Sequence, residues 1–213
     1  MIWIGSIWLA ALLYFFLISL FVAILRLVQR LWPFMSGIFF SNRFKLSVFT
    51  ISIIVTGIIL TTGYYNANRI AVKHQDINIP KQAGNNQTLN VVMVSDIHLG
   101  TLIDYNHLQK IVEKINSLDP DIILMPGDLV DSDLEPVLKK NSGEAFKALN
   151  SRLGIYATTG NHEFIGGVQE ATEYLEQYNI QFLRDTSLFI NDRFYLIGRE
   201  DREINRFEGK ERK

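Results

Sequence analysis

Three short apolar runs, each ending in a cluster of polar residues, constrain the fold of this chain most strongly. The runs cover residues 91–94, 121–125 and 154–159, about thirty residues apart. Because a helical region follows each of the first two runs, the order predicts βαβ units with right-handed crossovers and a parallel sheet. The first run is continuous rather than alternating, so we expect its strand to be buried on both faces.

Patterns between and after these runs extend the same alternation. Asp104 is expected to cap a helix whose apolar face runs through residues 108–118. From residue 198 onward the sequence is highly charged and has no core-forming pattern. A second helical pattern and three further short strands are expected at residues 168–178, 180–183, 188–190 and 194–197, with the turn of the last pair at Asn191-Asp192.

The polar clusters supply candidate metal ligands. Because the carboxyl ends of parallel strands share one sheet edge, we expect the clusters to meet there. Oxygen and imidazole groups suit divalent Mn, Fe or Zn, and the chain has no cysteine. Gly127 and Gly160 are expected to turn the backbone sharply through positive φ angles. The clusters are Asp96 and His98, then Asp128 and Asp131, then Asn161, His162 and Glu163.

A carboxylate that follows a glycine turn, as Asp128 does, can bridge two ions. Two ions ~3.5–4 Å apart lower the pKa of a bound water and clamp the oxygens of a phosphoryl displacement. These residues therefore point toward phosphoester hydrolysis.

The blocks D-x-H, G-D-x-x-D and G-N-H-E, in this order, resemble those of the calcineurin-like metallophosphoesterases, most closely the membrane-attached bacterial branch. The resemblance implies the N-terminal part of an α+β-type phosphoesterase sandwich, two divalent metal ions (Mn, Fe or Zn) and a metal-bridging hydroxide as nucleophile. It assigns the first metal to Asp96 and His98, the bridging position to Asp128 and the second metal to Asn161.

The same resemblance gives His162 a catalytic role beside the phosphate, where it would stabilise the transition state or protonate the leaving oxygen. Asp131 and Glu163 are interpreted as groups that orient the ligands without binding the ions. A helix N-cap is the alternative for Asp131.

The chain departs from the family pattern after residue 162. That pattern continues with a lone histidine and a G-H-x-H block, whereas none of the four histidines here follows His162. We expect a fragment of a longer protein, with a naturally degenerate, metal-poor relative as the alternative. In both cases the 213-residue chain is expected to bind metal weakly and hydrolyse little. A non-catalytic membrane module that keeps the fold for partner binding is the rival function.

Two uncharged apolar stretches precede this domain, at residues 1–25 and 46–65. Each is long enough for a bilayer, which needs about 20 apolar residues. A signal peptide is disfavoured because no basic region precedes the first stretch, and buried core helices are the other alternative. We predict a membrane anchor with two transmembrane helices over residues 1–65, a linker over 66–88 and the phosphoesterase domain over 89–213.

The charges are distributed unequally between the two parts. Residues 1–65 hold four of the 21 basic and none of the 22 acidic residues, which leaves residues 66–213 a net charge of about −5. No nucleic-acid partner is expected, because there is no clustered basic face. The positive-inside rule puts the basic loop at 26–45 in the cytoplasm and the soluble domain outside a cell membrane. The expected partners are the bilayer and a phosphoester substrate, either lipid-linked or soluble.

Overall fold

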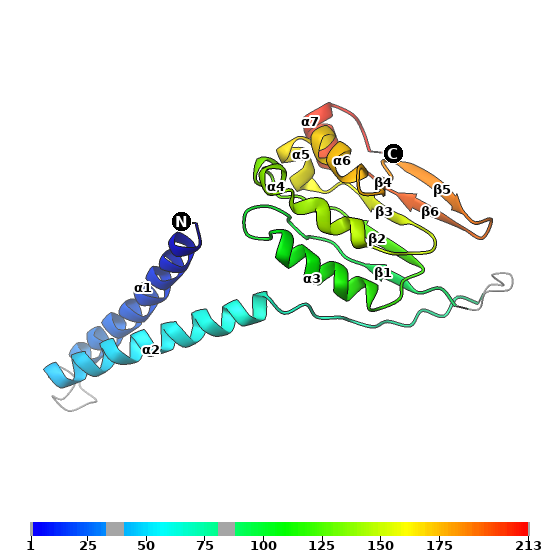
Figure 1. Ribbon diagram of the computed structural model, residues 1–213. Helices are drawn as coiled ribbons and strands as arrows, with labels where there is room; N and C mark the ends of the chain where they lie inside the picture. The colour runs from blue at the N-terminus through cyan, green and yellow to red at the C-terminus, as the bar shows by residue number, and fades with distance from the viewer. Residues whose placement is uncertain (1, 33–40, 81–87, 213) are drawn as a thin grey trace. The chain divides into compact units, whose positions relative to one another are not determined.

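The computed structural model describes residues 2–32, 41–80 and 88–212. The chain forms two compact units, Met1–Lys73 and His74–Lys213. The first unit is helical and the second is a mixed α/β domain (Figure 1). The predicted fold class is therefore confirmed, while the boundaries at residues 65 and 88 remain predictions.

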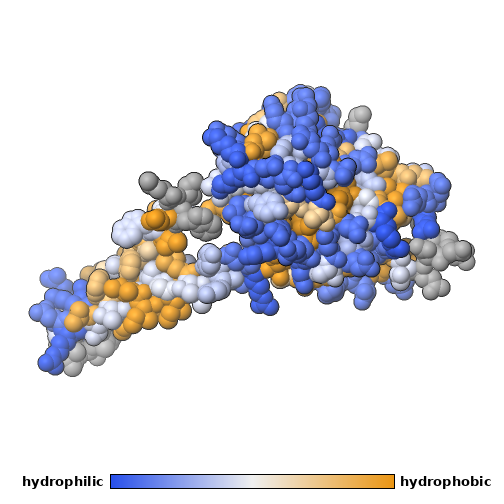
Figure 2. Space-filling model, in the orientation of Figure 1, coloured by the Kyte–Doolittle hydropathy of each residue, from blue (hydrophilic) through white to orange (hydrophobic). Residues whose placement is uncertain are grey.

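Two long apolar helices make up the first unit, α1 (Ile2–Leu31) and α2 (Asn42–Ala67). At 1.5 Å per residue their 30 and 26 residues span about 45 and 39 Å, more than the ~30 Å hydrocarbon core of a bilayer. Many of their large apolar side chains are exposed and form the orange surface of this unit in Figure 2. Both helices are long and apolar enough to cross a membrane, and they indicate membrane association.

The basic residues expected in a loop between these helices lie within the helices instead. Arg26 and Arg30 belong to the last turns of α1, and Arg43 and Lys45 to the first turns of α2. Long charged side chains can extend from the end of an apolar helix toward water, so they need not end it. The middle of the predicted loop, residues 33–40, lies outside the described residues.

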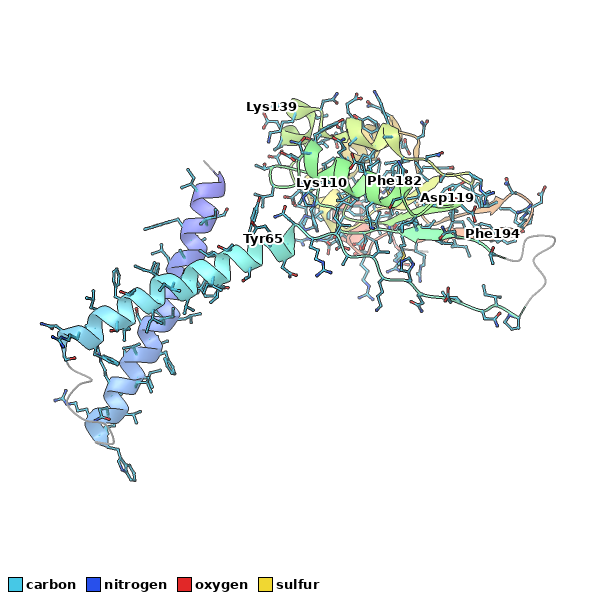
Figure 3. The ribbon with its side chains drawn as sticks, turned by 60° about the horizontal axis from the view of Figure 1, so that its bottom comes forward. Tyr65, Lys110, Asp119, Lys139, Phe182 and Phe194 are labelled. Carbon is cyan, nitrogen blue, oxygen red and sulfur yellow. The ribbon has the colours of Figure 1, made fainter. Side chains whose placement is uncertain are left out.

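Small polar side chains lie where the two helices pack together. Ser52 and Thr56 are one helical turn apart on α2, and both are buried. Small residues let two apolar helices approach closely, as in membrane helix pairs. Figure 3 shows Tyr65 near the carboxyl end of α2, where the helix gives way to an irregular segment that runs to residue 80.

Four parallel strands form the sheet of the second unit, in the order β1-β2-β3-β4. Right-handed crossovers that step in one direction place their helices on one face of the sheet, as Figure 1 shows for α3 and α6. The strands are β1 (Val91–Met93), β2 (Ile122–Pro126), β3 (Ile155–Thr158) and β4 (Ile180–Phe182). The connections hold α3 (Tyr105–Asn116), α4 (Glu135–Lys140), η2 (Ser142–Ala148), α5 (Asn161–Gly166) and α6 (Val168–Glu176). Asp104 caps α3 as predicted, accepting a hydrogen bond from the His107 amide.

The core lies between this sheet and its helices, and it corrects the expectation for the first strand. Val92 is buried on the helix-covered side and pairs in register with Ile123. Its neighbours Val91 and Met93 point to the opposite side and are 44% and 70% exposed. The prediction of burial on both faces was therefore wrong, because β1 is an edge strand and the crossover helices all cover the other face.

A hairpin and a short helix complete the second unit. Strands β5 (Thr186–Ile190) and β6 (Phe194–Gly198) pair antiparallel. Asn191 and Asp192 both have positive φ, as the central residues of a type I′ turn do, and the Arg193 amide donates to the Ile190 carbonyl at 3.0 Å, so the predicted turn is confirmed. The charged run forms α7 (Glu203–Glu208), in which Ile204 is buried. The run therefore contributes a buried apolar side chain, although its sequence shows no core-forming pattern.

Candidate metal centre

The carboxylate of Glu163 ties together the two loops that follow β2 and β3. Its Oε1 accepts hydrogen bonds from the amides of Leu129 and Val130, at 2.7 and 3.0 Å. Its Oε2 accepts from the amides of Asp128 and Gly160, at 3.0 and 2.8 Å. Glu163 is only 1% exposed, so these four bonds replace its hydration. The sequence assigned Glu163 an orienting role, and the structure gives the contacts through which it can act.

The loop after β1 pairs with the loop after β2 through the main chain. The amide of Asp96 donates to the carbonyl of Gly127 at 3.2 Å, and the amide of His98 donates to the carbonyl of Asp128 at 3.0 Å. Buried Ile97 and Leu99 alternate with Asp96 and His98, so the polar pair points away from the core. This main-chain pairing places Asp96, His98 and Asp128 at the same edge of the sheet.

Three candidate ligands have left-handed backbone conformations that the sequence did not predict. The φ angles of Asp96, His98 and Asp128 are +56°, +49° and +55°. Such a conformation costs about 1–3 kcal/mol for a residue other than glycine, although Asp and His tolerate it better than most. The surrounding hydrogen bonds hold this strain at the site.

These loops bring His98, Asp128 and His162 together. One ligand atom from each lies within 4.8 Å of the others, a separation compatible with a shared metal ion. The two imidazole rings meet edge to face, with their centroids 4.4 Å apart. Two imidazoles and a carboxylate form a donor set that suits Mn, Fe or Zn.

His162 is held at both its main chain and its ring. Its amide donates to Asp128 Oδ1 at 2.9 Å, and its Nδ1 lies 3.1 Å from Asp131 Oδ1. A second neighbour that the sequence did not indicate, Ser132 Oγ, lies 3.0 Å from the same nitrogen. Asp131 does not cap α4, whose N-cap is Leu134, so its alternative role is excluded.

Asp96 and Asn161 are neighbours of this group in the sequence, two residues before His98 and directly before His162. Within the described part of the chain, Asp96 is not among the side chains that converge with His98 and Asp128, and it is exposed. Asn161 is the first residue of α5 and is also exposed. Their assignment as metal ligands stays a prediction.

The two glycines contribute in different ways. Gly127 has a φ of +80°, as predicted, and lies against the backbone of Gly160. Gly160 has a φ of −115°, so the prediction of a positive angle was wrong. It is required for space instead, since a Cβ at this position would lie 2.3 Å from Asp128 Oδ1.

A buried ionic cluster supports the Gly160 loop from behind. Glu200, only 2% exposed, accepts hydrogen bonds from Thr159 Oγ1 and Arg184 Nε. Arg184 also donates to Glu208 on α7, at 3.0 Å. Burial lowers the pKa of Arg184, but its hydrogen bonds to the two glutamates outweigh this effect and raise the pKa overall. Sequence reasoning missed this cluster, because nothing in a charged run indicates which charges pair.

In a comparison with known protein families, residues 89–210 match the family model described as calcineurin-like phosphoesterase. The chain is 32% identical over 149 residues to a transmembrane protein with metallophosphoesterase domain from Danio rerio, covering 68% of this chain and 33% of that protein. It is 32% identical over 144 residues to an uncharacterized metallophosphoesterase from Campylobacter jejuni. That match covers 66% of this chain and 37% of the relative.

A third relative is a UDP-2,3-diacylglucosamine pyrophosphatase from Chlamydia muridarum, 30% identical over 122 residues that cover 55% of this chain and 36% of that protein. The matches thus span about a third of the length of these relatives. The family implies divalent metal ions, in agreement with the group formed by His98, Asp128 and His162. The chain belongs to the calcineurin-like phosphoesterase family of hydrolases.

Proposed function

We propose that this protein is a membrane-anchored phosphoester hydrolase that uses divalent metal ions. The observation that carries the proposal is the convergence of His98, Asp128 and His162 at the carboxyl edge of the sheet. The two apolar helices ahead of the domain support the anchor. When bound, a pair of ions supplies a water activated at neutral pH and neutralises charge on the phosphoryl oxygens.

Each side chain has a distinct part in this proposal. Asp96 and His98 would hold the first ion, Asp128 would be shared by both ions, and Asn161 would hold the second. His162 contacts the phosphoryl group, where its imidazole can donate a hydrogen bond or a proton to the leaving oxygen. Glu163 fixes the main-chain amides of Asp128 and Leu129, so the loop holds the Asp128 carboxylate in place without metal.

The proposed substrate is a phosphoester or pyrophosphate that carries a lipid. A membrane anchor brings the domain near such molecules, and one relative is named as a pyrophosphatase for a diacylated sugar nucleotide. A soluble phosphodiester is the other candidate. Hydrolysis of a lipid-linked pyrophosphate and of a soluble nitrophenyl phosphodiester, measured side by side with the full-length protein, separates the two.

Asp128→Ala in the full-length protein tests the hydrolase proposal. It removes the proposed ligand of both ions, so manganese-dependent hydrolysis should disappear. His162→Ala should lower turnover while leaving metal content closer to that of the wild type. More than a few per cent of residual activity in Asp128→Ala would count against the bridging role.

We also propose that the 213-residue chain binds metal weakly. Of the proposed ligands, the group that converges among the described residues contains His98 and Asp128, few donors for a pair of ions. Calorimetric titration with manganese should give weak binding. Sub-micromolar binding at two sites would contradict this expectation.

A further inference from the structure

Ser132 has a position that the proposed function leaves unexplained. Its Oγ lies 3.0 Å from Nδ1 of His162, closer than the carboxylate of Asp131 at 3.1 Å. Two oxygen atoms from adjacent residues therefore converge on one ring nitrogen. The question is what a hydroxyl adds beside a carboxylate.

The carboxylate fixes the tautomer of the imidazole. Ionised Asp131 can only accept hydrogen bonds, so the Nδ1 atom that faces it carries the hydrogen. The hydroxyl of Ser132 then acts as a second acceptor for the same N–H, and Nε2 is left for a substrate oxygen or an ion. A ring flip would take Nδ1 away from both oxygens, and a change of tautomer would break the contact with the Asp131 carboxylate, which cannot donate a hydrogen.

Asp131 alone is a weak anchor. Its side chain is 52% exposed, so solvent screens its attraction for the imidazole. The oxygen that faces the ring, Oδ1, also accepts the amide hydrogen of Ser132 at 2.8 Å. This one oxygen therefore faces two donors at once.

Ser132 is fixed to the same helix that carries His162. Gly166, the last residue of α5, packs so closely that a Cβ there would lie 2.5 Å from the carbonyl oxygen of Ser132. His162 is the second residue of that helix. The carboxyl end of α5 thus contacts the main chain of Ser132, and the amino end places the His162 ring beside the Ser132 hydroxyl.

We propose that Ser132 is a positioning residue for His162, in which the hydroxyl shares the Nδ1 hydrogen with Asp131 and holds Nε2 toward the reacting phosphoryl group. This inference rests on the proposed function. Because Ser132 acts through the imidazole, its loss should slow turnover without weakening substrate binding.

The kinetic test uses the full-length protein, manganese and a nitrophenyl phosphodiester. Ser132→Ala should lower kcat about three- to tenfold, the range of one hydrogen bond, and leave KM unchanged. Ser132→Thr keeps the hydroxyl, so it should retain most of the wild-type kcat. Ser117→Ala is the matched control, because it removes a hydroxyl whose bonding within the described residues is to the Lys114 carbonyl alone, at 2.7 Å. Wild-type kcat in Ser132→Ala would overturn the proposal.

A spectroscopic test separates this inference from the proposed function. The metal-free 213-residue chain is labelled with ¹⁵N-histidine, and the signal of His162 is assigned by its loss in His162→Gln. At a pH of about 8, the wild type should show a protonated Nδ1, and Ser132→Ala should shift population toward a protonated Nε2. If the full-length wild type is inactive but the tautomer shifts in Ser132→Ala, the hydrolase proposal alone is refuted. An unchanged tautomer in Ser132→Ala would refute the positioning role.

Discussion

Glu163→Gln is the substitution that tests how the ligand loops are held. The amide has nearly the size and shape of the carboxylate, so it changes charge and hydrogen bonding with little change in packing. Its oxygen can accept from two of the four main-chain amides. Its NH₂ group then faces the other two, and donor meets donor.

The size of the effect follows from the contacts. A hydrogen bond to a charged group contributes about 1.5–3 kcal/mol, and two of the four are lost. The local free energy of opening should therefore fall by about 3–6 kcal/mol, a large share of the ~5–15 kcal/mol that stabilises a typical domain.

Hydrogen–deuterium exchange of the 213-residue chain in detergent measures this directly. Peptides that contain the amides of Asp128 and Gly160 should exchange about a hundredfold or more faster in Glu163→Gln. Glu173→Gln is the control, because Glu173 is exposed and, in the part of the chain that the structure describes, accepts from the side chain of Gln169 alone. Its exchange rates should match the wild type. Wild-type protection of the ligand loops in Glu163→Gln would refute the proposed support.

Three further predictions follow from other parts of the site. Gly160→Ala should lower manganese affinity measured by calorimetry, because the added Cβ would overlap Asp128 Oδ1, while Gly63→Ala, with open space around it, should not. Hydrogen bonds from Lys210 and then Arg184 lower the pKa of Glu208 below its ordinary value of about 4.5. The stabilisation that ionised Glu208 provides is therefore fully present above a pH of about 4.5, and it is lost as the pH falls through the lower pKa of the folded state. Glu208→Gln should lower the urea midpoint at pH ~6 and much less at pH ~3. Glu200→Gln leaves Arg184 with a weaker partner and should increase exchange of the Thr159–Gly160 amides, and equal exchange would contradict support from that cluster.

Much of the site could be predicted because strand ends in parallel sheets share an edge. Once residues 91–94, 121–125 and 154–159 were assigned as strands, Asp128 and His98 had to lie near each other. The positive φ of Gly127 and the turn at Asn191-Asp192 were also predictable, because both depend on local backbone preferences.

Tertiary packing decided the features that the sequence did not predict. Whether Met93 is covered depends on which face the crossover helices occupy, and an apolar run carries no such information. Gly160 is required by the nearness of Asp128, which lies in another loop. The pairing of Glu200 with Arg184 brings together residues on either side of the hairpin, so the charged run gave no indication that part of it is buried.

Electron paramagnetic resonance of Mn²⁺ bound to the 213-residue chain tests the central claim most directly, since it detects ligands even when binding is weak. With ¹⁵N-histidine in the protein, the echo modulation of bound Mn²⁺ should show imidazole nitrogen. That signal should weaken in His98→Ala, and bound Mn²⁺ should be lost in Asp128→Ala. Bound Mn²⁺ without nitrogen modulation, or a spectrum unchanged by both substitutions, would contradict a metal centre at this edge of the sheet.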